Sequence, residues 1–291
     1  FIHKDRPTNR REVCEINVNL VLQYRQRDKS GEERRMTMMT PQEIMEMLAE
    51  HGKWLVNSKK GARANFKHAD FTGANFAGAK LQKSSLSGCK LSRSIFRGAN
   101  LISADLYAAD LTKADLRDAL LIRADLRGAE LKGAKLNGAN LQEADFRGGS
   151  LILSGGETVT FPAGDLSDAE MENVVAEKAN LNGANLSGAA LGNANFAYSQ
   201  LKGANLTKAD LHGAGFTGSD MAGCDLTGAD LAGADLSNVN LSGAKVEGCN
   251  FEDVKLDGAK LENVDFSKAK SGATHLVQEP ESTPLPPNLQ A

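Results

Sequence analysis

Large apolar residues recur at every fifth position of the chain from residue 66 to residue 266. Leu or Phe occupies 36 of these 41 positions. The exceptions are Gly156, Met171, Ala176, Met221 and Val246. The residue two places earlier is always Ala, Ser, Cys, Gly or Val, and it is Ala in 26 of the 41 cases. One register held over this length indicates an internal repeat that dominates the fold.

A period of five fits neither the 3.6-residue period of an α-helix nor the two-residue period of a strand. The chain must turn every five residues so that one large and one small side chain face the same interior. Four such sides make a coil of about twenty residues, and stacked coils pair their backbones at a spacing of ~4.8 Å. Gly, Asn, Asp and Ser at the other positions favour turns. The pattern therefore predicts an all-β solenoid.

The repeat register also resembles a known family. Its Ala-(Asp/Asn)-Leu-x-x pattern, as in Ala109-Asp110-Leu111-Thr112-Lys113, is similar to that of the pentapeptide-repeat proteins. The resemblance covers residues 64–270 and implies a right-handed quadrilateral β-helix, here of about ten coils because each coil uses four repeats. It implies no single function, because one fold serves many roles.

The repeat is interrupted at residues 152–164. Gly156 falls on an axial position of the expected coil, and Pro162 directly follows another. We expect a protruding loop of five or ten residues here, with a degraded coil as the alternative, and deletion of residues 154–163 should then leave the fold intact. Met171 and Ala176 predict that the next coil is irregular as well.

Residues 40–63 are expected to form a capping helix and a lead-in to the first coil. Thr40 and Glu43 have the spacing of a capping box, and Pro41 occupies the favoured first helical position. A solenoid needs such a cover over its first coil. His51 and Trp54 are similar to the H-x-x-W-L leader of many bacterial pentapeptide arrays, so we interpret both as packing residues.

The two ends of the chain have different patterns. Residues 1–39 predict an N-terminal β-hairpin segment, because residues 16–24 alternate apolar and polar side chains, residues 28–31 favour a turn, and residues 34–39 can return as a second strand. Two strands alone are marginally stable, so they should pair with something, and a second copy of the chain is one option. Residues 271–291 form a Pro-rich tail of extended character.

The composition excludes several classes of protein. Aromatic residues make up 5% of the chain, which suits a narrow core of Leu and Ala. The formal net charge is −3, so the chain as a whole is no polycation. Residues 1–63 and 64–153 each carry 13 basic and 9 acidic side chains, whereas residues 154–270 carry 8 and 17. The molecule is thus a dipole with a basic first half and an acidic second half.

Neither enzyme chemistry nor a cofactor or metal site is indicated. The four cysteines show no CxxC spacing, and Cys89, Cys224 and Cys249 occupy the small inward position, where they substitute for Ala. We therefore predict a reducing compartment and a cytoplasmic protein. No apolar run approaches the ~18 residues of a membrane span. His212 is an isolated outward residue, and a rod with a filled axis has no cleft for catalysis.

Cationic side chains twenty residues apart should stack between neighbouring coils of the first half. We identify six candidate partner-binding residues in three such pairs: Arg93 with Lys113, Arg97 with Arg117, and Arg127 with Arg147. Such pairs either extend into water or form a site for an acidic partner or another anion. Asp105, Asp125 and Asp145 stack in the same way and should compensate part of this charge.

These features favour a non-catalytic scaffold or adaptor that binds other proteins through the walls and ends of the rod. One alternative is a DNA mimic that binds or protects a type II topoisomerase, as some pentapeptide-repeat proteins do. The acidic second half favours this role, but the basic first half opposes it. A second alternative is nucleic-acid or anion binding by the basic half, although we expect no DNA partner.

Overall fold

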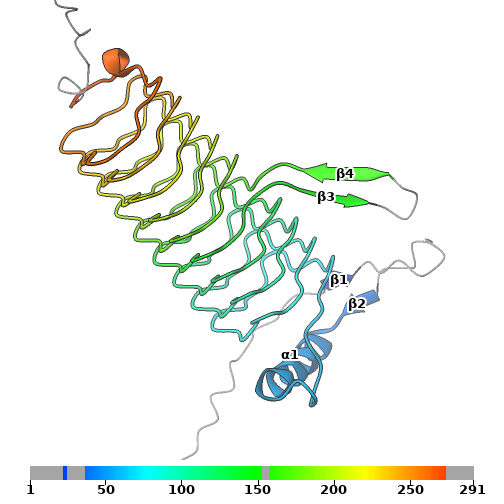
Figure 1. The fold of residues 1–291 in the computed structure, drawn as a ribbon. Helices are drawn as coiled ribbons and strands as arrows, with labels where there is room; N and C mark the ends of the chain where they lie inside the picture. Colours follow the sequence, from blue (N-terminus) through cyan, green and yellow to red (C-terminus); the bar gives the residue numbers. More distant parts are fainter. Residues whose placement is uncertain (1–21, 25–36, 153–156, 273–291) are drawn as a thin grey trace, which may run out of the picture.

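The computed structural model describes residues 22–24, 37–152 and 157–272. Its elements are β1 (Leu22–Tyr24), β2 (Thr37–Met39), α1 (Pro41–Val56), β3 (Gly149–Ile152), β4 (Thr158–Phe161) and the 3-10 helix η1 (Phe266–Lys268). Figure 1 shows a long rod of stacked coils with α1 across one end and the β3–β4 hairpin projecting from its side. β1 and β2 pair antiparallel next to α1. The remainder of the expected N-terminal hairpin and the Pro-rich tail from residue 273 lie outside the described residues.

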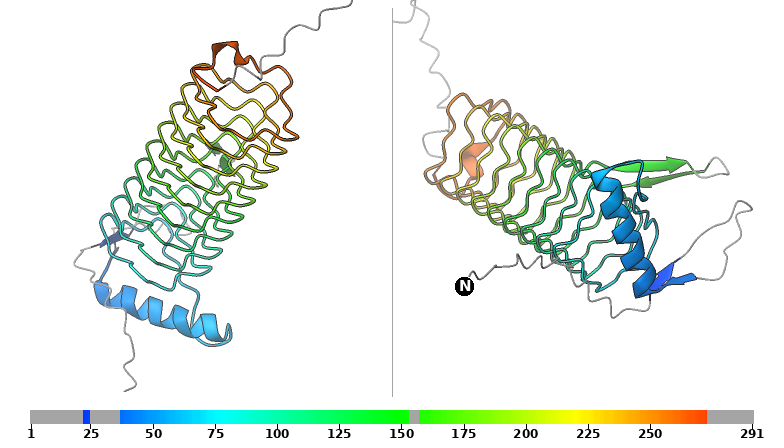
Figure 2. Two further views of the ribbon diagram at one scale, coloured as in Figure 1. Left: turned by 90° about the vertical axis from the view of Figure 1, so that its left-hand side faces the viewer. Right: turned by 90° about the horizontal axis from the view of Figure 1, so that it is seen from below.

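The rod is held together by four ladders of single parallel bridges between residues twenty positions apart. The ladders start at Asn65, Asp70, Asn75 and Lys80, so the chain closes one four-sided coil every twenty residues. The ladder from Asn65 to Lys260 joins ten residues through nine bridges within the described residues. Both views in Figure 2 show these coils stacked along one straight axis.

The axis is filled by one side chain from each side of the coil. Leu126 has no exposed surface, and the small residue before it, Ala124, is 1% exposed. Rings continue this packing near the N-terminal end, where Phe76 and Phe96 stack with centroids 5.1 Å apart. The alternation of large and small inward residues lets opposite walls approach, which gives a core only a few side chains wide.

Each side of the coil ends in a turn that explains the polar residues of the repeat. In one example Ala129 N–H donates to the Leu126 carbonyl at 3.0 Å, and Gly128 between them has a φ of 67°. A positive φ at the third residue identifies a type II turn, which favours Gly there. The Asp or Asn before the axial residue accepts a hydrogen bond from the N–H two residues later, as Asp125 does from Arg127 at 3.2 Å.

The interruption of the repeat is larger than the sequence predicts. Across it, the ladder partners Asp145 and Asn180 are thirty-five residues apart, whereas partners elsewhere are twenty apart, or twenty-one for the last bridge, Asn250 with Ser271. Gly164 N–H donates to the Phe146 carbonyl at 2.7 Å, a bond that the third residue after the axial one makes in a regular turn. Residues 149–163 are therefore an insertion of fifteen residues that overlaps the expected stretch of 152–164, and the expected length of five or ten residues is wrong.

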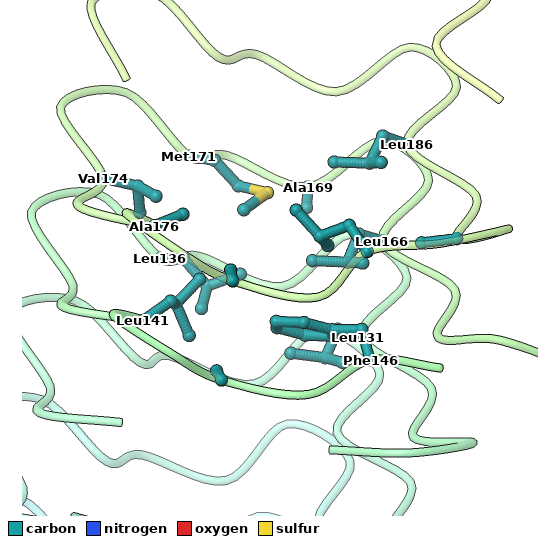
Figure 3. Packing of buried hydrophobic residues seen from close by; sticks show 14 of the residues in the cluster. Leu131, Leu136, Leu141, Phe146, Leu166, Ala169, Met171, Val174, Ala176 and Leu186 are labelled. Carbon is teal, nitrogen blue, oxygen red and sulfur yellow. The ribbon is translucent and has the colours of Figure 1, made fainter. Parts of the chain in front are cut away.

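The coil that follows the insertion is regular, contrary to expectation. Met171 and Ala176 are both buried on the axis, and the bridges to the neighbouring coils continue through Glu170 and Val175. Figure 3 shows the reason, because Val174 stands at the small inward position next to Ala176. The larger Val fills the volume that the smaller axial Ala leaves, which conserves the total core volume.

Helix α1 covers the first coil. It begins with the expected capping box, in which Thr40 and Glu43 each bond the other's backbone N–H. Ile44 and His51 are fully buried, and the Ala64 N–H donates to His51 Nδ1 at 3.1 Å. His51 therefore packs and accepts a hydrogen bond, and burial lowers its pKa. At the other end Phe266 of η1 packs edge-on against Phe251.

Candidate functional site

The interior of the rod offers no site for chemistry. Cys89, Cys224 and Cys249 are buried at the small inward position, and burial raises their thiol pKa values to about 12, about 12 and about 11. Thiols so far from ionisation are poor nucleophiles. In the described part of the chain, no three metal-ligating side chains lie together. The candidate functional residues of the described part of the chain therefore lie on the outer surface.

The six candidate cations lie on three different edges of the coil. Arg93 and Lys113 follow the ladder that begins at Asp70, while the Arg97–Arg117 pair follows the next ladder, from Asn75. Arg127 and Arg147 follow the ladder of Asn65, which puts them on the edge opposite to Arg97 and Arg117. The structure therefore brings together each pair but not the three pairs as one surface.

Two of the arginines share one carboxylate. The Arg117 guanidinium makes a bidentate contact with Asp115, at 2.8 and 2.7 Å, and Arg97 Nη2 from the preceding coil reaches the same carboxylate at 2.9 Å. Planar guanidinium groups suit this geometry. The carboxylate thus cancels part of the repulsion between the stacked arginines.

The arginines on the opposite edge are also paired. Arg127 binds Asp125 through two hydrogen bonds of 2.9 and 2.7 Å, and Arg147 binds Asp145 in the same way. Burial alone would raise the pKa of Asp145, but hydrogen bonds from Arg147 and its charge outweigh burial and lower that pKa. The predicted compensation by stacked aspartates thus takes the form of ion pairs along this edge.

The base of the β3–β4 hairpin rests on the same edge. Phe161 packs edge-on against Tyr107, with ring centroids 5.5 Å apart, and Arg127 lies over the other side of the Tyr107 ring at 5.4 Å. A Cβ at Gly128 would lie only 2.6 Å from the Cβ of Phe161. Sequence reasoning missed this contact, although Tyr107 at a normally polar outward position was a signal for it.

Arg93 and Lys113 differ from the other four cations. Among the described residues neither has a carboxylate within 4.0 Å, whereas each of the four arginines has one. Both side chains line a recess of about 290 Å³ on the edge of the rod. The other lining residues are Thr72, Ser92, Asp110 and Thr112. The recess thus combines two unpaired cations with three hydroxyl groups and a single carboxylate.

Comparison with known proteins places this architecture in a family. The model of the pentapeptide repeats matches eight copies of the repeat, which together span residues 62–151 and 165–270. The chain belongs to the pentapeptide repeat family. The gap between the matched segments, residues 152–164, overlaps the insertion of residues 149–163 that the ladders show. Pentapeptide repeat proteins form right-handed quadrilateral β-helices, in agreement with the expected fold class.

Solved structures of pentapeptide repeat proteins are similar to this chain. HetL from the cyanobacterium Nostoc sp. strain PCC 7120, described as involved in heterocyst differentiation regulation, is 28% identical, with 79% of this chain and 96% of HetL covered and a TM-score of 0.40. QnrB1, a plasmid-mediated fluoroquinolone resistance protein, is 19% identical over 70% of this chain and 92% of its own, with a TM-score of 0.46. A search of curated proteins gave no match.

Membership of this family indicates a general class of function but does not identify a partner. Pentapeptide repeat proteins are generally structural or binding proteins rather than enzymes. In the part of the chain that the structure describes, no helix has the length and apolar character that a membrane crossing needs.

Proposed function

We propose that this protein is a non-catalytic scaffold that binds an acidic protein partner through the outer edges of its first half. The observation that carries the proposal is the pair of unpaired cations, Arg93 and Lys113, beside the recess. Backbone pairing between coils fixes their spacing, so little ordering free energy is lost when an acidic surface binds. The rod then serves as a rigid support.

The four paired arginines have a secondary role in this proposal. Their charges are largely balanced by Asp115, Asp125 and Asp145, but their exposed guanidinium groups keep N–H donors that can contact a partner. We expect replacement of all four arginines by Ser to leave the fold intact and to weaken partner binding less than the change of Arg93 and Lys113 to Ser does. The reason is that the four arginines are already neutralised within the rod, whereas Arg93 and Lys113 keep their full charge for a partner.

The test is to crosslink the full chain to its partner in the source cell and then to measure affinity with the purified partner against ionic strength. The scaffold proposal expects binding that weakens with salt, and a shallower salt dependence for the variant Arg93→Ser/Lys113→Ser. A chain that remains monomeric and crosslinks to no protein would contradict it. An identical dependence of affinity on ionic strength for wild type and variant would show that the two cations are not part of the interface.

The acidic second half supports one second candidate, a mimic of duplex DNA that binds a type II topoisomerase. Asp210 and Asp230 stack in one ladder there, and residues 154–270 carry 17 acidic and 8 basic side chains. The experiment is a gyrase supercoiling assay with saturating protein. Unchanged supercoiling, together with unchanged sensitivity to a quinolone, would exclude this candidate.

A further inference from the structure

The backbone conformation at Arg93 and Lys113 is energetically unfavourable for a residue with a side chain. Both residues adopt the left-handed conformation, with φ values of 59° and 57°. Gly occupies many equivalent turn positions of the rod at no steric penalty, whereas a residue with a Cβ costs roughly 1 kcal/mol there. Eighteen non-Gly residues of the described chain adopt this conformation, so the backbone strain alone does not distinguish Arg93 and Lys113, and the pair is distinguished by its charges.

Electrostatics adds a second cost. The two residues are in neighbouring coils, joined by a hydrogen bond of 2.9 Å from the Arg93 N–H to the Thr112 carbonyl. Their like charges are therefore held about one strand spacing apart, and the backbone pairing does not let them separate. No carboxylate of the described residues neutralises either charge within 4.0 Å. The fold thus holds two cations side by side in a strained conformation without an internal counterion.

The chemistry around these cations fits one class of ligand. A guanidinium offers a planar fork of N–H donors, an ammonium offers a point charge, and the hydroxyls of Thr72, Ser92 and Thr112 add donors along the same edge. A phosphate monoester presents three acceptor oxygens and a charge of about −1.5 to −2 at neutral pH. A carboxylate has fewer acceptor oxygens and about half that charge, so it would use this set of donors less fully.

We propose that the Arg93–Lys113 recess binds a phosphate monoester, with the two cations clamping its oxygens. Asp110 lies in the wall of the recess, where its Oδ1 accepts the Thr112 N–H at 2.9 Å. Its charge reduces the net positive charge of the recess to one, so it limits the affinity, and its repulsion acts more strongly on a dianion than on a monoanion. The phosphate comes either from a phosphorylated partner protein or from the free ion, and only the first source rests on the proposed scaffold function.

The same edge of the second half provides a matched control. Lys208 is also left-handed, with a φ of 58°, and is preceded by Thr207 at the position that Thr112 has before Lys113. The residues stacked on either side of Lys208 are Gly188 and Gly228, so it has no second cation beside it. A site that needs two stacked cations should therefore exist at Arg93 and Lys113 and not at Lys208.

The experiment is an NMR titration of the full chain at constant ionic strength, with inorganic phosphate as the first probe. Saturable shifts of the backbone amides of residues 92–93 and 112–113 are expected. The variant Arg93→Gly/Lys113→Gly should lose them while its thermal midpoint stays equal or rises, because Gly is unstrained at a positive φ. Lys208→Gly should bind as the wild type does.

A change that should improve binding makes the test sharper. Asp110→Asn keeps the side-chain oxygen that accepts the Thr112 N–H and removes the negative charge, so phosphate should bind roughly three- to tenfold more tightly. Non-saturating shifts in the wild type, shifts that survive in the double Gly variant, or an Asp110→Asn variant that binds no better would each overturn the proposal.

A second probe separates the site from the scaffold function. A synthetic peptide that contains phosphoserine is compared with the same peptide carrying Ser. Tighter binding of the phosphorylated peptide than of inorganic phosphate supports a phosphorylated partner. If inorganic phosphate binds saturably while the phosphopeptide binds no more tightly, that outcome would support the anion site and would contradict a role of that site in the scaffold function.

Discussion

At the scale of single residues, the rod depends on the contrast between large and small inward side chains. Leu126 fills the axis with no exposed surface, and Ala124 lets the adjacent wall approach. Where the axial residue is small, a larger residue stands at the neighbouring small inward position, as Val174 does beside Ala176. Both kinds of position are thus intolerant of a change in volume, in opposite senses.

Leu126→Ala should leave a cavity in this narrow core and reduce the free energy of unfolding by ~2 to 5 kcal/mol. Ala124→Leu should overpack the wall and reduce it by ~1 to 3 kcal/mol. Denaturant unfolding of both variants measures these changes. A half-buried ladder substitution, Asn140→Asp, keeps the oxygen that accepts the Gln142 N–H at 3.0 Å and is the control with a near-zero change. Unchanged midpoints in both core variants would show that neither position faces inward.

His212 is the residue through which pH should act near neutrality. Its Nδ1 lies 2.6 Å from Asp210 Oδ1, and this hydrogen bond and the Asp210 charge raise its pKa. A raised folded-state pKa means that the stabilising contribution is complete below the ordinary pKa of about 6.5 and is lost as pH rises through the raised value. NMR titration should show the raised pKa in the wild type and a lower one in Asp210→Asn. Equal values would mean that the pair does not form in solution.

At the scale of elements, the β3–β4 hairpin is an addition to the coil rather than a part of it. The Phe146 carbonyl accepts the Gly164 N–H as it would in a regular turn, although fifteen additional residues lie between the two. Phe161 then fastens the base of the hairpin to Tyr107. The coils on either side keep their ladder partners, so the rod carries the hairpin without a change of axis.

Deletion of residues 149–163 should join Gly148 directly to Gly164 and leave all four ladders aligned. The loss of the Phe161 contact with Tyr107 should lower the thermal midpoint only modestly. Cysteines placed at the bridge partners Glu130 and Asp165 should oxidise to a disulfide in this variant as in the full chain, because bridged residues are close enough for that bond.

Deletion of residues 154–163 is the matched comparison. It leaves five extra residues, which make one additional side of the coil and rotate the second half by one face. Residue 165 then stacks on residue 135 instead of residue 130, so the same cysteine pair should stay reduced. A disulfide of equal yield in both deletions would show that residues 149–153 stay outside the coil in the second variant, which would contradict the expected rotation.

At the scale of the whole molecule, the two ends of the rod are covered unequally. Helix α1 buries Ile44 and His51 over the first coil. Among the described residues at the far end, Phe266 of η1 is buried, whereas Leu256 and Leu261 of the last coils remain partly exposed. In a solenoid each coil contacts only its neighbours, so stability should decrease towards the less covered end.

The buried cysteines can report this gradient. With Cys14 replaced by Ser, a thiol reagent under native conditions should modify Cys249 first, Cys224 next and Cys89 last, because each reacts only when its coil opens. Mass spectrometry of proteolytic fragments gives the three rates. Equal rates would indicate that the rod opens as one unit, and fastest reaction at Cys89 would contradict the capping role of α1.

Much of this architecture is readable from the sequence because side-chain direction in the coil depends only on position within five residues. The periodicity alone identifies Leu126 as axial and Ala124 as a wall residue. The capping box at Thr40 and Glu43 is equally local, since both partners lie within one helical turn. The buried cysteines follow from the same register.

Other features depend on contacts that the register does not contain. A frame of five survives an insertion of any multiple of five, so only the ladder partners of Asp145 and Glu130 reveal that fifteen residues leave the coil. A long arginine can reach the carboxylate of its own coil or of the next one, and geometry alone selects Asp115 as the common partner of Arg97 and Arg117. Among the six candidate cations, that selection leaves Arg93 and Lys113 without a carboxylate of the described residues within 4.0 Å. Such pairing is a property of the folded rod.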